Sequence, residues 1–336
     1  MSKGFTRRPG ARIPIQRVVV GLAQILSVIA FVSIVFILLT AASANSMMKA
    51  DKTPVSNIPS NILPPYSPTS FKSFDKQTNL SGWFFKTADP KSTVIIIHGT
   101  GSNRMAFNVE TVDLVRDFLE NGFNVFMFDQ RNSGESEGIT TGFGYMEWKD
   151  VIGAIDHVRK ISVTTDVILY GIGSGCSSAL IAASKLPQSD EPEKKVSDAI
   201  KDLPFDGSYI AGFILDSPAK MSDDYIRPIA ANDFTFGFLT QYSIPYAIRI
   251  SAGESENLNL ASEIARTSVP VCILYGDRDL FIKTSFIDQI VTERKRLHPS
   301  TTTAEKFTGA GYVEAFAIAP ERYREVITEF LDSHFQ

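Results

Sequence analysis

The chain has few of the residues on which disulfide-bonded and metal-binding proteins depend. Its 336 residues include only 2 cysteines and 4 histidines, and none of these has the spacing of a metal site. Cys176 and Cys272 each lie in an apolar run, so a disulfide between them is not expected. A phosphate-binding loop and the dinucleotide glycine pattern are also missing. We therefore expect neither a metal nor a cofactor.

Negative charge is missing from the amino-terminal end. The formal net charge is −4, yet no acidic residue precedes Asp51. Five basic residues precede the apolar run that begins at Val18: Lys3, Arg7, Arg8, Arg12 and Arg17. The rest of the chain is therefore more acidic than the whole. An acidic body repels the phosphate backbone, so nucleic acid is excluded as an expected partner.

Charge is absent altogether from Val18 to Leu39, and most of these residues are apolar. The run is long enough to cross a bilayer as a helix, which takes about 20 residues, and it exceeds the about 7–15 residues of a signal-peptide core. Residues 18–42 are predicted to be a transmembrane signal-anchor. A signal cleaved near Ala42-Ser43-Ala44, giving a secreted protein, and a buried helix of a soluble protein remain alternatives.

The basic residues decide the expected orientation. Residues 1–17 form a basic flank, which the positive-inside rule places in the cytoplasm. The sequence thus predicts a single-pass protein of the cell membrane with its body outside the cytoplasm. Residues 43–70 are rich in Pro, Ser and Asn and are predicted to be an extended linker with little packing of its own.

Residues 71–336 alternate between apolar β-rich runs and helical spacing. Strands are expected at 80–85, 93–97, 124–128, 167–170, 210–215, 269–275 and 303–307, with helices between most of them. This alternation predicts an α/β protein with a mostly parallel sheet covered on both faces. Residues 219–267 break the alternation and are the expected cap or lid.

One stretch has the pattern of a strand, a sharp turn and a helix. Val167 to Leu180 is an apolar run, then a glycine-rich turn, then a run of small residues. This is the context of the G-x-S-x-G nucleophile elbow. Gly171 and Gly175 match its outer glycines, but Gly173 stands where the serine belongs. The serine present, Ser174, comes one position later.

Five blocks in this order resemble the α/β-hydrolase superfamily, and specifically its serine esterase and peptidase-like branch. The resemblance covers about residues 71–335. The blocks that carry it are HGTG at 98–101, DQRNSGESEG at 129–138, the elbow, LYGDRD at 274–279 and GAGYVEA at 309–315. The resemblance implies an α/β-hydrolase fold, with Gly99 and Thr100 in the loop that supplies an oxyanion-hole N–H. It also implies that Asp279 is the acid of a Ser–His–Asp triad and that Tyr312 stands at the position of the histidine.

Two of the three catalytic positions therefore differ from the family pattern. Glycine offers no nucleophile, and a phenol titrating near pH 10 is a poor base at neutral pH. The leading hypothesis is an inactive or severely impaired hydrolase homologue that binds a small acyl or peptide ligand, or a protein partner. The alternative is an active hydrolase that uses Ser174 with His98.

Two further features are also expected at the site. The N–H groups of Ser174 and Thr100 are expected to be able to polarise a carbonyl still. The Tyr312 hydroxyl is expected to approach the Asp279 carboxylate, directly or through one water.

Overall fold

The computed structural model describes residues 15–336 except 57, 60 and 189–196, so most of the basic flank lies outside the described residues. Its centre is an 8-stranded sheet with the order β1-β2-β4-β3-β5-β6-β7-β8. The strands are β1 (Tyr66–Lys72), β2 (Asn79–Phe85), β3 (Ser92–Ile97), β4 (Phe123–Phe128), β5 (Val167–Ile172), β6 (Ile210–Asp216), β7 (Val271–Gly276) and β8 (Thr302–Phe307).

The strands from β4 to β8 run parallel, and β1 and β2 add an antiparallel edge beside β4. Every residue of β3, β4 and β5 is buried. Continuous apolar runs of this kind suit strands with a helix layer on each face, so the predicted mostly parallel sheet is confirmed. Strand β1 was not expected, because its burial is limited to Phe71 and its partly covered neighbour Thr69.

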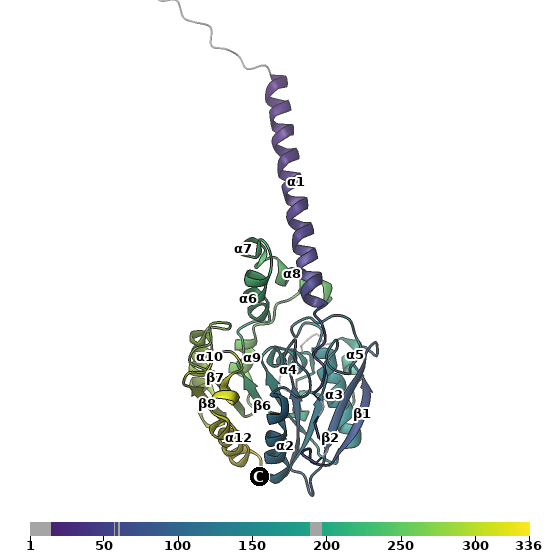
Figure 1. Ribbon diagram of the computed structural model, residues 1–336, viewed down its shortest axis with the longest axis vertical. Helices are drawn as coiled ribbons and strands as arrows, with labels where there is room; N and C mark the ends of the chain where they lie inside the picture. Colours follow the sequence, from purple (N-terminus) through teal and green to yellow (C-terminus); the bar gives the residue numbers. More distant parts are fainter. Residues whose placement is uncertain (1–14, 57, 60, 189–196) are drawn as a thin grey trace, which may run out of the picture.

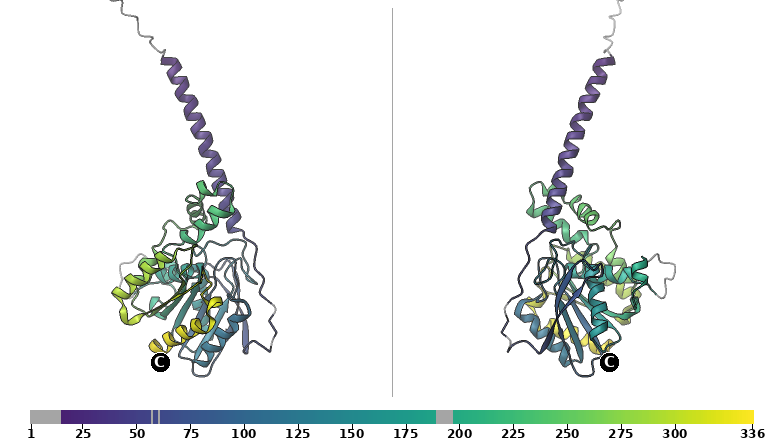
Figure 2. Two further views of the ribbon diagram at one scale, coloured as in Figure 1. Left: turned by 60° about the vertical axis from the view of Figure 1, so that its left-hand side comes forward. Right: turned by 90° about the vertical axis from the view of Figure 1, so that its right-hand side faces the viewer.

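Helices cover both faces of the sheet (Figures 1 and 2). The core on one face joins strand residues such as Ile96 to α2 (Thr111–Glu120) and α12 (Pro320–His334). The core on the other face joins strand residues such as Leu169 to the remaining layer, which comprises α3 (Trp148–Ile161), α4 (Ser174–Lys185), α9 (Leu260–Arg266) and α10 (Thr284–Leu297). Short helices α5 (Asp198–Lys201) and α11 (Ala315–Ile318) lie in connections.

We refer to the region between β6 and α9 as the cap. It contains α6 (Asp223–Asp233), α7 (Gly237–Thr240) and α8 (Ile244–Ser251), with no strand among them. The interruption of the alternation predicted at 219–267 is thus present. The cap lies at the foot of α1 (Figure 1).

Helix α1 (Ile15–Met48) projects from the domain (Figure 1). It is long and apolar enough to cross a membrane, and most of it is exposed. Its last turns are different, because Ala44, Met47 and Met48 are buried in the core of the domain. The helix therefore continues beyond the predicted boundary at residue 42.

The predicted linker at 43–70 is in part wrong. Residues 43–48 are helical, and residues 66–70 belong to β1. The chain between them is bonded to the domain: Thr53 donates its hydroxyl to the Gly101 carbonyl at 2.6 Å, and Asn103 donates to the Pro54 carbonyl at 3.1 Å. A count of Pro, Ser and Asn identifies an irregular segment but not the surface against which it lies.

Candidate active site

The elbow predicted from the glycine pattern is present. Gly173 follows β5 with φ 56° and ψ −126°, and α4 begins at the next residue. Glycine adopts this backbone readily, whereas other residues are strained there. The outer glycines permit close backbone approach, since a Cβ on Gly171 would lie 2.6 Å from the Cys176 Cα and one on Gly175 would overlap the Ile97 carbonyl.

The Tyr312 hydroxyl fills the space in which a serine side chain would stand. A Cβ built on Gly173 would overlap that hydroxyl oxygen. The Tyr312 ring is stacked on Phe281, with 4.5 Å between ring centroids. Burial raises the pKa of Tyr312 well above 10, and only the nearby Ser174 backbone N–H acts in the other direction. The group at the centre of the site is therefore a neutral phenol.

The loop that carries Tyr312 is held in a strained conformation. Val313 has φ 56°, which is rare for a β-branched residue and costs about 1–3 kcal/mol. Its N–H donates to the Ser217 Oγ at 3.0 Å, and Ser217, also at φ 56°, donates in turn to Asp216 at 2.9 Å. These bonds fix the direction in which Tyr312 points.

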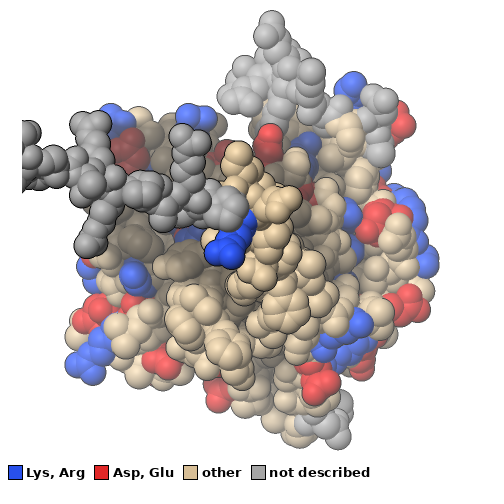
Figure 3. All heavy atoms as spheres, turned by 90° about the horizontal axis from the view of Figure 1, so that it is seen from above, with Lys and Arg blue, Asp and Glu red and all other residues tan. Residues whose placement is uncertain are grey.

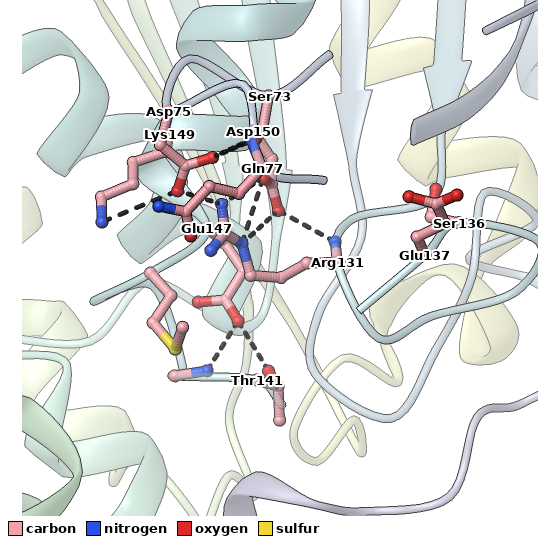
Figure 4. A network of polar contacts seen from close by, with 12 residues as sticks. Ser73, Asp75, Gln77, Arg131, Ser136, Glu137, Thr141, Glu147, Lys149 and Asp150 are labelled. Carbon is pink, nitrogen blue, oxygen red and sulfur yellow. Dashed lines mark hydrogen bonds and ion pairs between the residues drawn. The ribbon is translucent and has the colours of Figure 1, made fainter. Parts of the chain in front are cut away.

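Ser174 lies beside the elbow, and its hydroxyl is fully engaged. Its Oγ accepts the Thr100 N–H at 2.8 Å and donates to the Thr100 hydroxyl at 3.0 Å. Thr100 lies 3.4 Å from the Thr141 hydroxyl, which donates to the Glu147 carboxylate at 2.7 Å (Figure 4). The Thr100 N–H is therefore not free to polarise a carbonyl, because the Ser174 hydroxyl accepts it.

His98 directly follows β3. Its Nδ1 lies 2.8 Å from the Gly99 carbonyl, and its Nε2 accepts the Gln130 N–H at 3.0 Å. Since Nε2 accepts, Nδ1 carries the proton. Burial lowers the pKa of His98, so the ring is neutral. Both nitrogens are engaged by the backbone, and the structure does not pair His98 with Ser174.

Asp279 lies shortly after the end of β7 and is buried. One carboxylate oxygen accepts the N–H groups of Phe281 and Ile282, both at 2.8 Å. The other oxygen is buried and has no hydrogen-bond partner among the described residues. The expected direct bond from Tyr312 is therefore absent, because the phenol is turned toward Gly173. Burial raises the pKa of Asp279.

Solved structures share this arrangement of strands and helices. An esterase of Pyrococcus furiosus superposes with a TM-score of 0.63 at 21% identity, over 87% of this chain and 99% of that one. A malate-bound esterase of Thermogutta terrifontis gives a TM-score of 0.54 at 16% identity, over 80% and 100% of the two chains.

The chain has the α/β-hydrolase fold.

Sequence comparisons agree with this fold. Residues 88–196 match the model of the family described as serine aminopeptidase, S33. The uncharacterised protein YfhR of Salmonella typhimurium is 37% identical over 112 residues, which are 31% of this chain and 36% of that protein. The uncharacterised protein YqkD of Bacillus subtilis is 21% identical over 76% of each chain. The chain thus spans about a third of the length of YfhR.

The turn at residues 129–138, which follows β4, is held by two buried ion pairs. The Asp129 carboxylate receives Arg104 at 2.5 Å and fills the space that a side chain on Gly134 would need. Arg131 bonds Asp150 at 2.7 Å, with Asp75 on its far side at 3.4 Å (Figure 4). These contacts explain why the motif combines Asp, Arg and Gly. The bonds between Arg104 and Asp129 also join this turn to the loop that follows β3.

Sequence reasoning missed Asp216, a second carboxylate at the carboxyl end of the sheet. It ends β6, is fully buried and accepts the Tyr323 hydroxyl at 2.8 Å. Burial raises its pKa to about 6, and the charge of Asp279 acts in the same direction. The available signal was an acidic residue directly after an apolar strand. Among the described residues, no group of three or more His, Cys, Asp or Glu side chains is placed to hold a metal.

Proposed function

We propose that this chain is a membrane-anchored α/β-hydrolase-fold protein that does not hydrolyse its ligand and acts by binding a ligand or a protein partner. The observation that carries the proposal is the overlap between the Tyr312 hydroxyl and the space of a side chain at Gly173. The positions of nucleophile, histidine and acid are Gly173, Tyr312 and Asp279.

The site lacks the groups that two steps of acyl transfer require. Attack on a carbonyl needs a nucleophile on the elbow, and Gly173 supplies none. Proton transfer needs a base near neutral pH, and burial holds the Tyr312 phenol neutral far above that range. Asp279 alone performs neither step.

Binding at the site is also restricted. A carbonyl oxygen that enters the oxyanion hole would have to displace the Ser174 hydroxyl from the Thr100 N–H. The Tyr312 hydroxyl also occupies the space beside Gly173. A ligand that binds there must move the loop 309–315. A partner bound at the outer surface needs no such movement.

Fluorophosphonate labelling of the full-length protein tests the absence of catalysis. The expected result is no labelled serine. Labelling that a Ser174→Ala change abolishes would identify Ser174 as a nucleophile and would overturn the proposal. A serine hydrolase of known reactivity in the same detergent shows that the probe is active.

The anchor and the orientation belong to the same proposal. Helix α1 supplies the span, and the basic residues before it favour a cytoplasmic amino end. The domain would then lie outside the cytoplasm at the cell membrane.

A further inference from the structure

The cap exposes an apolar surface beside α1. Six side chains form it, each at least 50% exposed, and together we name them the cap patch: Phe236, Phe238, Leu239, Tyr242, Tyr246 and Ile250. Between Asp233 and Arg249 the sequence has no Asp, Glu, Lys or Arg. Clustered apolar side chains on a surface mark a contact with a partner or a membrane.

The cap patch is the outer side of helices whose inner side is already packed. On α8, Ile244 and Ile248 are fully buried, whereas Tyr246 and Ile250 point outward. The helix is thus apolar on both sides. A surface helix of a soluble protein would have polar residues on its outer face.

The position of the cap patch follows from its contact with α1. The hydroxyls of Thr40 and Ser243 lie 2.9 Å apart, and Ser243 directly follows Tyr242 of the patch. On α1, residues before Thr40 such as Leu38 are exposed and apolar, and residues after it such as Ala44 are buried in the domain. Thr40 therefore marks the level at which the apolar helix leaves the protein, and the patch lies at that level.

The residues around the cap patch are consistent with a lipid bilayer covering it. In the view down onto this end of the molecule, most of the middle is uncharged and most charged side chains lie around the rim (Figure 3). The guanidinium of Arg227 lies 5.8 Å from the Tyr242 ring centre, and that of Arg249 lies 5.3 Å from the Tyr246 ring centre. Tyrosine rings with neighbouring cations are typical of the boundary between acyl chains and headgroups.

We propose that the cap patch inserts into the membrane leaflet that surrounds the carboxyl-terminal end of the α1 span. This inference rests on the proposed membrane anchoring of α1. The patch would reach about 5–10 Å into the boundary between headgroups and acyl chains. A single helix lets a domain rotate, whereas a helix and a patch together fix its orientation. Because Tyr225 of α6 contacts Tyr312, with 6.2 Å between ring centroids, the cap over the site would then face the bilayer.

The test uses the full-length chain in phosphatidylcholine vesicles with an environment-sensitive fluorophore on one introduced cysteine. Cys176 and Cys272 are fully buried, and the unsubstituted protein measures any background labelling. Phe238→Cys reports on the patch and Ile25→Cys on the span. Val163→Cys is the matched control, because Val163 is 82% exposed and precedes β5 at the opposite end of the sheet.

The measurement is quenching by lipids brominated on their acyl chains. We expect the probes at 25 and 238 to be quenched, the latter by about half given its shallow depth, and the probe at 163 to be unchanged. Quenching at 25 without quenching at 238 would overturn the inference and leave the anchor intact. No quenching at 25 would overturn the anchor and the inference with it. A probe at 238 that is shielded from water but not quenched would show that protein, such as a second copy of this chain, covers the patch, and would also overturn it.

Discussion

At the scale of single residues, the site is defined by which hydroxyl occupies which space. The sequence predicts that Gly173 takes the serine position and Tyr312 the histidine position, and the structure brings these two residues together. The sequence could not predict that the Tyr312 phenol would turn toward Gly173 and leave one oxygen of Asp279 without a partner among the described residues. That direction depends on Ser217 and on the strained backbone of Val313, which no motif records.

The first prediction concerns the space beside Gly173. Gly173→Ala adds a Cβ that overlaps the Tyr312 hydroxyl and also strains the backbone, so the free energy of unfolding should fall by more than the about 1–3 kcal/mol of strain alone. In a Tyr312→Ala background the overlap is gone. The coupling between the two changes, measured by chemical unfolding, should be about 0.5–3 kcal/mol.

Gly253→Ala is the matched control for this prediction. Gly253 has φ +78°, and a Cβ there would meet nothing within 4 Å. Its cost therefore reports backbone strain without overlap. Equal costs at 253 and 173, with no coupling to Tyr312, would contradict the placement of the phenol.

The second prediction concerns pH. Burial raises the pKa of Asp216 to about 6 from 3.8, so the folded state binds a proton that the unfolded state releases between these values. The contribution of this group to the free energy of unfolding should therefore fall as pH rises from about 4 to 6, by roughly 1–3 kcal/mol. Asp216→Asn, which keeps an acceptor for Tyr323, should remove that part of the slope. If the free energy of unfolding changed equally with pH in both proteins between pH 4 and 6, this would contradict the raised pKa of Asp216.

At the scale of elements, the helices and strands with regular apolar patterns could be predicted from the sequence. The packing of β1 and of the last turns of α1 on the domain could not. Continuous apolar runs identified the buried strands, and helical spacing identified α2, α3, α10 and α12. Strand β1 was missed because only one face of it packs, beside a segment rich in proline. The last turns of α1 were assigned to a linker because small and polar residues surround the apolar side chains that pack there.

A third prediction follows from the docked end of α1. Met47 is 6% exposed and belongs to the core, so Met47→Ala should lower the free energy of unfolding of the domain by about 2–5 kcal/mol. Leu26→Ala is the control, since Leu26 is 65% exposed on the projecting part of α1. Chemical unfolding in detergent measures both. Equal stabilities of the two variants would mean that residues 43–48 are a free tether after all.

At the scale of the whole molecule, the chain combines a hydrolase-fold domain with one apolar helix near its amino end. The uneven distribution of charge predicts the orientation of that helix, but neither the fold nor the relatives bear on it. The sequence likewise predicts the fold from five blocks at strand ends, whereas it leaves the ligand open because a fold carries many functions.

The fourth prediction is the orientation itself. In intact cells, added protease should digest residues 71–336 and leave an amino-terminal tag protected, because the basic flank stays in the cytoplasm. Lysed cells provide the control in which both parts are digested. Protection of the domain in intact cells would reverse the orientation, and release of the domain into the medium would indicate a cleaved signal.

The most direct test of the central claim is to restore the missing groups. If Tyr312 stands in the space of the nucleophile and the rest of the site persists, Gly173→Ser with Tyr312→His should yield a serine that reacts with fluorophosphonate and hydrolyses an activated ester weakly. Neither single variant should react comparably, since nucleophile and base act as a unit and Tyr312 obstructs a serine at 173. We expect labelling at residue 173 of the double variant alone. A folded double variant without labelling, or equal labelling of the unsubstituted protein, would contradict it.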